Sequence, residues 1–192
     1  NTSGAEGGDS QAEAGAQEEG DEDPGAGSPA GEVEIQILAI NDFHGHLEPP
    51  SGSSGKIAGQ DAGGVAYLAS RVQSLRSENP NSVVVSAGDL IGGSPLVSAF
   101  FHDEPTIAIM NEIGLQLNAV GNHEFDEGTQ ELLRMQSGGC HPVDGCQGPK
   151  SDFEGAQFRF LAANVRYRDS GDAIFPGVEV LRSEEHTSEL QS

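Results

Sequence analysis

Short apolar runs rich in β-branched residues recur along the chain, and most are followed by polar residues or glycine. Runs of this length and composition are typical of buried strands rather than of short helices. The pattern therefore predicts strands at five places, which are residues 33–40, 83–87, 117–120, 158–165 and 177–181.

Between these runs, apolar residues return every three or four positions, which is the spacing of one face of a helix. One helix is predicted over residues 65–79, because the residue before Pro80 disfavours helical backbone. A second is predicted over 105–114, and a third over 129–138 with Thr129 as its cap. Strands that alternate with helices predict a layered α/β domain.

Polar clusters follow the first three predicted strands. They are Asn41-Asp42-Phe43-His44, Gly88-Asp89 and Gly121-Asn122-His123-Glu124. Ligands collect outside the carboxyl ends of strands in α/β sheets, so we expect the three clusters to meet there. Side chains two apart on extended backbone point the same way, which predicts that Asp42 and His44 bind one divalent cation together.

The other two clusters add complementary groups. Asp89 has two carboxylate oxygens that can bridge neighbouring cations, Asn122 has a neutral amide oxygen for a metal, and His123 is left to face a substrate. Each cluster alone is common in loops, turns and helix caps. Their joint order after three separate strands predicts two metal ions held over a phosphate.

The chain resembles the calcineurin-like metallophosphoesterases, and within them the secreted bacterial 5′-nucleotidase and UDP-sugar hydrolase family. The resemblance covers about residues 33–181 and is carried by the strings at residues 37–48, 86–89 and 118–126. It implies a four-layer sandwich in which two packed β-sheets are flanked by helices.

The resemblance also implies a role for each site residue. Asp42 and His44 would bind the first metal, Asp89 would bridge both metals, and Asn122 would bind the second. His123 would stabilise the transferring phosphoryl group, and Asp126 would orient its imidazole ring. The cofactors would be two divalent ions, zinc, manganese or similar, because Asp, Asn and His ligands accept several such ions.

The chain departs from the family pattern in its later part. Three further histidines normally complete the two metal shells, two of them in a Gly-His-x-His segment that this sequence lacks, and the base-binding carboxy-terminal domain is also missing. His46 is interpreted as support for the first ligands. His102, His141 and His186 are interpreted as surface or loop histidines. We therefore expect a catalytic domain truncated on its C-terminal side, which is inactive and poorly folded alone.

Both ends of the chain are expected to lie outside the folded domain, which we place at residues 35–181. Residues 1–34 hold ten acidic and no basic residues and are rich in Gly, Ala, Ser and Pro, which predicts a disordered acidic linker. Residues 182–192 look like the translation of a sequencing adapter, and genomic DNA that encodes them would refute this interpretation.

The net charge of −22 argues against a nucleic-acid partner, which demands basic surface. The sequence has no apolar run of the length that spans a membrane and no signal peptide. Because the chain begins at Asn1 rather than Met, the lack of a signal peptide does not argue against export. The acidity and the resemblance together predict an extracellular or cell-envelope protein.

The two cysteines, Cys140 and Cys146, enclose five residues that include Pro and Gly. Such a segment bends enough for the sulfurs to bond, and export favours a small-loop disulfide. The open alternative is a free or metal-bound pair, for which His141 is the soft ligand nearby.

The function that the resemblance implies is metal-dependent hydrolysis of nucleotide 5′-phosphates, with a small nucleotide as the partner. One alternative keeps the chemistry but changes the substrate to 2′,3′-cyclic nucleotides or another phosphomonoester. The other is a secreted, non-catalytic binding protein on the same fold. The sequence does not indicate the oligomeric state.

Overall fold

The computed structural model describes residues 33–147 and 153–182, and all of them except the first belong to one compact unit, Glu34–Ser192. The predicted linker lies outside the described residues except for its last two positions. The predicted adapter-derived segment lies outside them except for Arg182. The described residues therefore lie mainly in the expected catalytic domain, residues 35–181.

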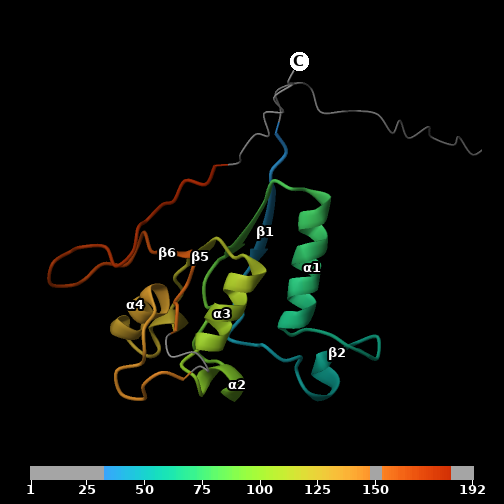
Figure 1. The fold of residues 1–192 in the computed structure, drawn as a ribbon, viewed down its shortest axis with the longest axis horizontal. Helices are drawn as coiled ribbons and strands as arrows, with labels where there is room; N and C mark the ends of the chain where they lie inside the picture. The colour runs from blue at the N-terminus through green and yellow to red at the C-terminus, as the bar shows by residue number, and fades with distance from the viewer. Residues whose placement is uncertain (1–32, 148–152, 183–192) are drawn as a thin grey trace, which may run out of the picture. The chain divides into compact units, whose positions relative to one another are not determined.

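A four-stranded parallel sheet forms the centre of this unit (Figure 1). Its strands, in spatial order, are β1 (Gln36–Ile40), β4 (Ser82–Ser86), β5 (Leu117–Ala119) and β6 (Arg159–Leu161). The first four predicted strands are confirmed, although β1 starts later and β6 is shorter than expected. The fifth prediction is wrong, because residues 177–181 form no strand and their valine side chains are exposed.

The three predicted helices are confirmed as α1 (Val65–Glu78), α3 (Glu104–Ile113) and α4 (Thr129–Ser137). Helix α3 ends at Gly114, whose φ of 79° is the left-handed conformation that glycine adopts without strain. Thr129 is the first helical residue rather than the cap, which is Gly128. A short helix, α2 (Leu96–Ala99), was not predicted.

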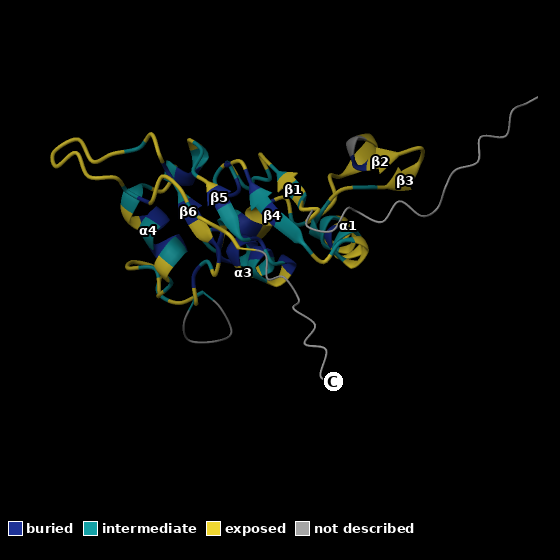
Figure 2. Ribbon diagram, turned by 90° about the horizontal axis from the view of Figure 1, so that it is seen from above, coloured by how far each residue is buried: buried dark blue, intermediate teal, exposed yellow. Residues whose placement is uncertain are grey.

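Helices α1, α3 and α4 lie on one side of the sheet, as the view in Figure 2 shows. The core lies between them and the sheet and includes Val84, Ile107, Met110, Leu132 and Phe160, all at most 1% exposed. On β1, Ile37 remains 68% exposed. A parallel sheet with helices packed on it confirms the predicted α/β class.

The expected sandwich has two packed sheets. The described residues form one of them, the four-stranded parallel sheet. The remaining strands, β2 (Lys56–Ile57) and β3 (Gln60–Asp61), pair as a small antiparallel hairpin that follows a single 3-10 turn, η1 (Gly52–Gly55). Every helix in the described part of the chain falls short of the length and apolar character that a membrane span requires.

Candidate metal and phosphate site

The loops that follow β1, β4 and β5 are joined by hydrogen bonds at one edge of the sheet. The backbone N–H of Asp42 donates to the carbonyl of Gly88 at 3.0 Å, and the N–H of His44 donates to the carbonyl of Asp89 at 3.0 Å. The N–H of His123 donates to Asp89 Oδ1, also at 3.0 Å. Asp89 therefore contacts both neighbouring loops, which brings the three predicted clusters together.

The backbone in these loops is not the extended chain that we expected. Asp42, His44 and Asp89 have φ values of 51°, 46° and 50°, in the left-handed region that costs a non-glycine residue free energy. The prediction that Asp42 and His44 share a side because the strand continues is therefore wrong in its geometry. Tight turns, held by the inter-loop hydrogen bonds, set the directions of these side chains instead.

A group of possible metal ligands lies where the loops meet. His44, Asp89 and His123 each offer an atom, and these three atoms lie within 4.8 Å of one another. The His44 and His123 rings meet edge to face, with centroids 4.8 Å apart. Imidazole nitrogens and a carboxylate oxygen are the ligands that zinc and similar cations prefer, so the donor set fits a metal.

The protonation of His44 also fits metal binding. Its Nδ1 lies 2.7 Å from the carbonyl oxygen of Gly92, which can only accept a hydrogen bond. Nδ1 therefore carries the proton, and Nε2 keeps its lone pair for a cation. Metal-binding histidines usually have one nitrogen held in this way.

The other two predicted ligands, Asp42 and Asn122, lie on the loops that carry this group. Asp42 is exposed, and its carboxylate accepts a hydrogen bond from the side chain of Asn41. Asn122 is exposed and precedes the 3-10 turn η2 (His123–Phe125). Asp42 follows the same strand as His44, and Asn122 follows the same strand as His123.

His123 and Asp126 form the pair that their spacing suggested. The ring Nδ1 lies 2.8 Å from Asp126 Oδ2, which also accepts the backbone N–H of Gly93 at 3.0 Å. The hydrogen bond to Asp126 raises the pKa of His123, and the charges of Asp126, Asp89 and Glu124 act in the same direction. The imidazole is therefore biased toward its cationic form, which suits contact with a phosphate.

Glu124 supports the site, and sequence reasoning gave it no role. Its side chain is 3% exposed and accepts hydrogen bonds from the backbone N–H groups of Asp89, Leu90 and Gly121, at 2.7 to 3.0 Å, and from the Asn118 amide at 3.1 Å. A buried carboxylate with four donors fixes the loops after β4 and β5 relative to each other. In the sequence, only its position next to His123 in the third cluster connected Glu124 with the site.

Asp103 supports the site in a similar way and was also missed. This buried residue accepts the backbone N–H of Gly92 at 2.9 Å and the Ser98 hydroxyl at 2.6 Å. Because the Gly92 carbonyl binds His44, Asp103 holds the segment that orients this histidine. It lies beyond α2, so no local pattern connected it with the clusters.

Gly121→Ala should disrupt the site, although it replaces no predicted ligand. A Cβ at this position would lie 2.2 Å from Asp89 Oδ1 and 2.7 Å from the Asp89 backbone nitrogen. Asp89 must move, and we expect metal affinity measured by calorimetry to fall about 10-fold to 100-fold. Ala119→Ser, at an exposed position at the end of β5, should bind metal like the wild type. Equal affinities for both variants would contradict the geometry of Asp89.

A parallel sheet whose loops gather histidines and a carboxylate at one edge fits a metal-dependent hydrolase. Comparison with protein families agrees, because the calcineurin-like phosphoesterase profile matches residues 35–168. The chain belongs to this family, and the matched segment is a metal-dependent phosphoric ester hydrolase domain.

Three relatives illustrate the range of similar proteins. An uncharacterized protein of Acinetobacter calcoaceticus is 50% identical over 76% of this chain and 77% of its own length. Endonuclease YhcR of Bacillus subtilis is 37% identical over 82% of this chain and 13% of its own. The snake venom 5′-nucleotidase of Gloydius brevicauda is 36% identical over 73% of this chain and 21% of its own. The chain thus spans only a small part of the latter two.

Among solved structures, the NAD nucleotidase of Haemophilus influenzae matches with a TM-score of 0.59 and 28% sequence identity. The match covers 79% of this chain and 25% of the nucleotidase. The similarity therefore lies in one segment of a longer enzyme.

Proposed function

We propose that this segment belongs to an enzyme that hydrolyses nucleotide 5′-phosphates with two divalent cations. Asp42 and His44 would hold one cation, Asn122 the other, and Asp89 both. The observation that carries the proposal is the convergence of His44, Asp89 and His123. His44 donates its Nδ1–H to a carbonyl, which leaves Nε2 for a cation. Bound cations of this kind polarise the phosphate and supply hydroxide near neutral pH.

The residues of this chain have separate tasks in the proposed reaction. His123 donates from its free ring nitrogen to a phosphoryl oxygen, where negative charge increases in the transition state. Asp126 keeps the other nitrogen protonated and, through the N–H of Gly93, fixes the ring beside the loop that holds His44. Asp89 positions the backbone of His123. Metal ligands and phosphate contact are thus joined by direct hydrogen bonds.

The choice of a nucleotide rests on the relatives, several of which are named 5′-nucleotidases or NAD nucleotidase. The site itself contacts only a phosphate, so cyclic nucleotides and other phosphomonoesters are the alternative substrates. A non-catalytic binding protein is the weaker candidate, because binding alone does not require the hydrogen-bonded His123–Asp126 pair beside the ligand cluster.

An extracellular or cell-envelope location is part of the proposal. One relative is named a cell wall protein, and others are snake venom enzymes. The Cys140–Cys146 disulfide, which confirms the predicted pairing, supports the same location, because disulfides persist in oxidising compartments.

Phosphate release from AMP and UDP-glucose tests the proposed activity. We expect the 192-residue chain to be inactive and a reading frame extended past Leu181 to be active, since the family's remaining histidine ligands are absent from this sequence. Activity should disappear with a chelator and return with zinc or manganese. Bis(p-nitrophenyl) phosphate and a 2′,3′-cyclic nucleotide are the comparison substrates. Rapid turnover by the 192-residue chain would contradict the first expectation, and a metal-independent extended enzyme would contradict the proposed mechanism.

A further inference from the structure

A second cluster of possible metal ligands lies outside the site described above. His102 lies in the turn between α2 and α3, Glu127 precedes α4, Glu131 is in α4, and His141 is in the disulfide loop. Each of these four side chains offers one ligand atom, and the four atoms lie within 4.8 Å of one another. We propose that His102, Glu127, Glu131 and His141 form an additional divalent-cation site, with zinc as its preferred ion.

Binding of an ion would require the side chains of the cluster to rearrange. Four ligands in a tetrahedral zinc site lie about 3.3 Å from one another, given bonds of about 2.0 Å. His102 Nδ1 lies 2.6 Å from Glu127 Oε2, so these two atoms would separate to admit the ion. The His102 and His141 rings are stacked, with centroids 3.9 Å apart and planes inclined by 10°. Binding of both rings to one ion requires this stack to open.

The charges around the cluster favour a cation. Four carboxylates surround it, those of Glu104, Glu127, Glu131 and Asp144, whereas Arg134 is the cation that pairs with two of them. Burial opposes protonation of His102, but the hydrogen bonds to Glu127 and Asp144 and the charges of Glu127 and Glu131 outweigh it and raise the pKa of His102. If the histidines are neutral, Arg134 offsets one of the four carboxylate charges and three remain. A divalent ion would offset two of these three.

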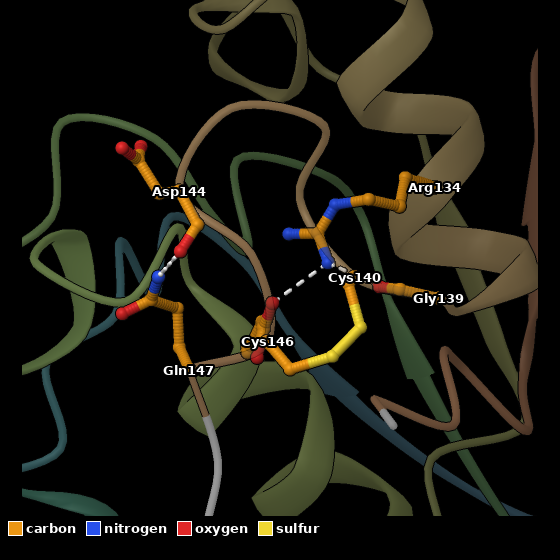
Figure 3. The surroundings of a disulfide bond; sticks show 7 residues. Arg134, Gly139, Cys140, Asp144, Cys146 and Gln147 are labelled. Carbon is orange, nitrogen blue, oxygen red and sulfur yellow. Dashed lines mark hydrogen bonds and ion pairs between the residues drawn. A yellow bond between two sulfur atoms is a disulfide. The ribbon is translucent and has the colours of Figure 1, made fainter. Parts of the chain in front are cut away.

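The ligands are held in place before any ion binds. Arg134 donates to both oxygens of Glu131, at 2.6 to 3.0 Å, which fixes this 8% exposed carboxylate. Arg134 also donates to the carbonyl of Gly139 at 2.7 Å and so anchors the base of the disulfide loop (Figure 3). Within the loop, His141 and Gly145 exchange backbone hydrogen bonds, and the disulfide closes the ring around them. Groups that orient metal ligands in this way normally strengthen binding.

The proposed site shares no ligand with the catalytic one but adjoins it. A small cavity of about 80 Å³ is lined by His123 and Asp126 from the catalytic group and by His102, Glu127 and Glu131 from the second cluster. An ion in the second cluster would fix the disulfide loop to the segment that carries His123 and Asp126. Its role would be to hold that segment in place rather than to contact the substrate.

Zinc titration of a variant that lacks the catalytic metal site tests this proposal. In the His44→Ala/Asp89→Asn double variant, competition with a chromophoric chelator should still detect one bound zinc per chain. Addition of either His141→Ala or His102→Gln should weaken this binding about 100-fold or more. Glu112→Gln is the control, since this exposed glutamate on α3 lies outside both clusters and its substitution should leave zinc binding unchanged. Circular dichroism checks that each variant remains folded.

Histidine NMR of the wild-type chain gives an independent readout. Zinc should shift the imidazole resonances of His102 and His141 together, because the stacked rings separate when both bind the ion. The proposal is overturned if the double variant binds no zinc, or if the His102 and His141 variants bind it as tightly as the Glu112 control. Because His44 and Asp89 are both replaced in the titrated chain, either result concerns the second cluster and leaves the proposed hydrolase activity untouched.

Discussion

Asp89→Asn should reduce metal-dependent phosphate release by about 1,000-fold or more in the active enzyme that contains this segment. One oxygen of this carboxylate accepts the N–H of His123, and its other lone pairs are available to the cations. Asparagine keeps the shape but removes the negative charge and replaces one acceptor by a donor. Steady-state kinetics with saturating zinc or manganese would measure the loss, and calorimetry would show weaker metal binding.

Asp169→Asn provides the comparison, because this aspartate is exposed and lies outside both ligand groups. It removes the same charge and should leave both kinetics and metal binding at the wild-type level. An Asp89→Asn enzyme with more than a tenth of wild-type activity would show that Asp89 is not a metal ligand.

Glu124→Gln should lower the free energy of unfolding by about 2–4 kcal/mol. The wild-type carboxylate accepts four hydrogen bonds while almost fully buried. In the glutamine variant, an NH₂ group would face N–H donors from the loops after β4 and β5. At least one buried donor would then lose its partner. Urea denaturation followed by circular dichroism measures the change.

Glu112→Gln serves as the matched substitution, since Glu112 is exposed on α3 and its change should cost less than about 0.5 kcal/mol. If both variants unfolded at the same urea concentration, the interpretation of Glu124 as the residue that joins the two loops would be wrong.

The regular part of the fold was predictable because its signals are local. Apolar β-branched runs identified the strands, and apolar residues spaced three to four positions apart identified the helices. Gly114 marked the end of α3, where left-handed backbone is required. The wrongly predicted strand at residues 177–181 had the same local pattern. It forms no ladder in the described structure, and a strand depends on a neighbour that its own sequence cannot reveal.

The meeting of His44, Asp89 and His123 was predictable from the sequence, but the geometry of their loops was not. The order of clusters after strands indicated which groups would meet, and parallel pairing of β1, β4 and β5 indicated where. The left-handed turns at Asp42, His44 and Asp89 arise from hydrogen bonds between loops, which no single segment encodes.

The supporting residues were missed for a related reason. Asp103 reaches the His44 loop through Gly92, and the second histidine cluster joins residues 39 positions apart in the chain, His102 and His141. Their functions depend on contacts across the fold, whereas sequence reasoning could only interpret these histidines one at a time.

We propose that Asp42, His44 and Asp89 bind divalent metal at the carboxyl edge of the sheet. Crystals of the enzyme grown with manganese or zinc, measured at the metal's absorption edge, test it directly through anomalous scattering. We predict a peak at coordination distance from the His44 Nε2 atom and an Asp89 carboxylate oxygen, with Asp42 beside it. Clear anomalous peaks elsewhere, with none near His44 and Asp89, would contradict the account.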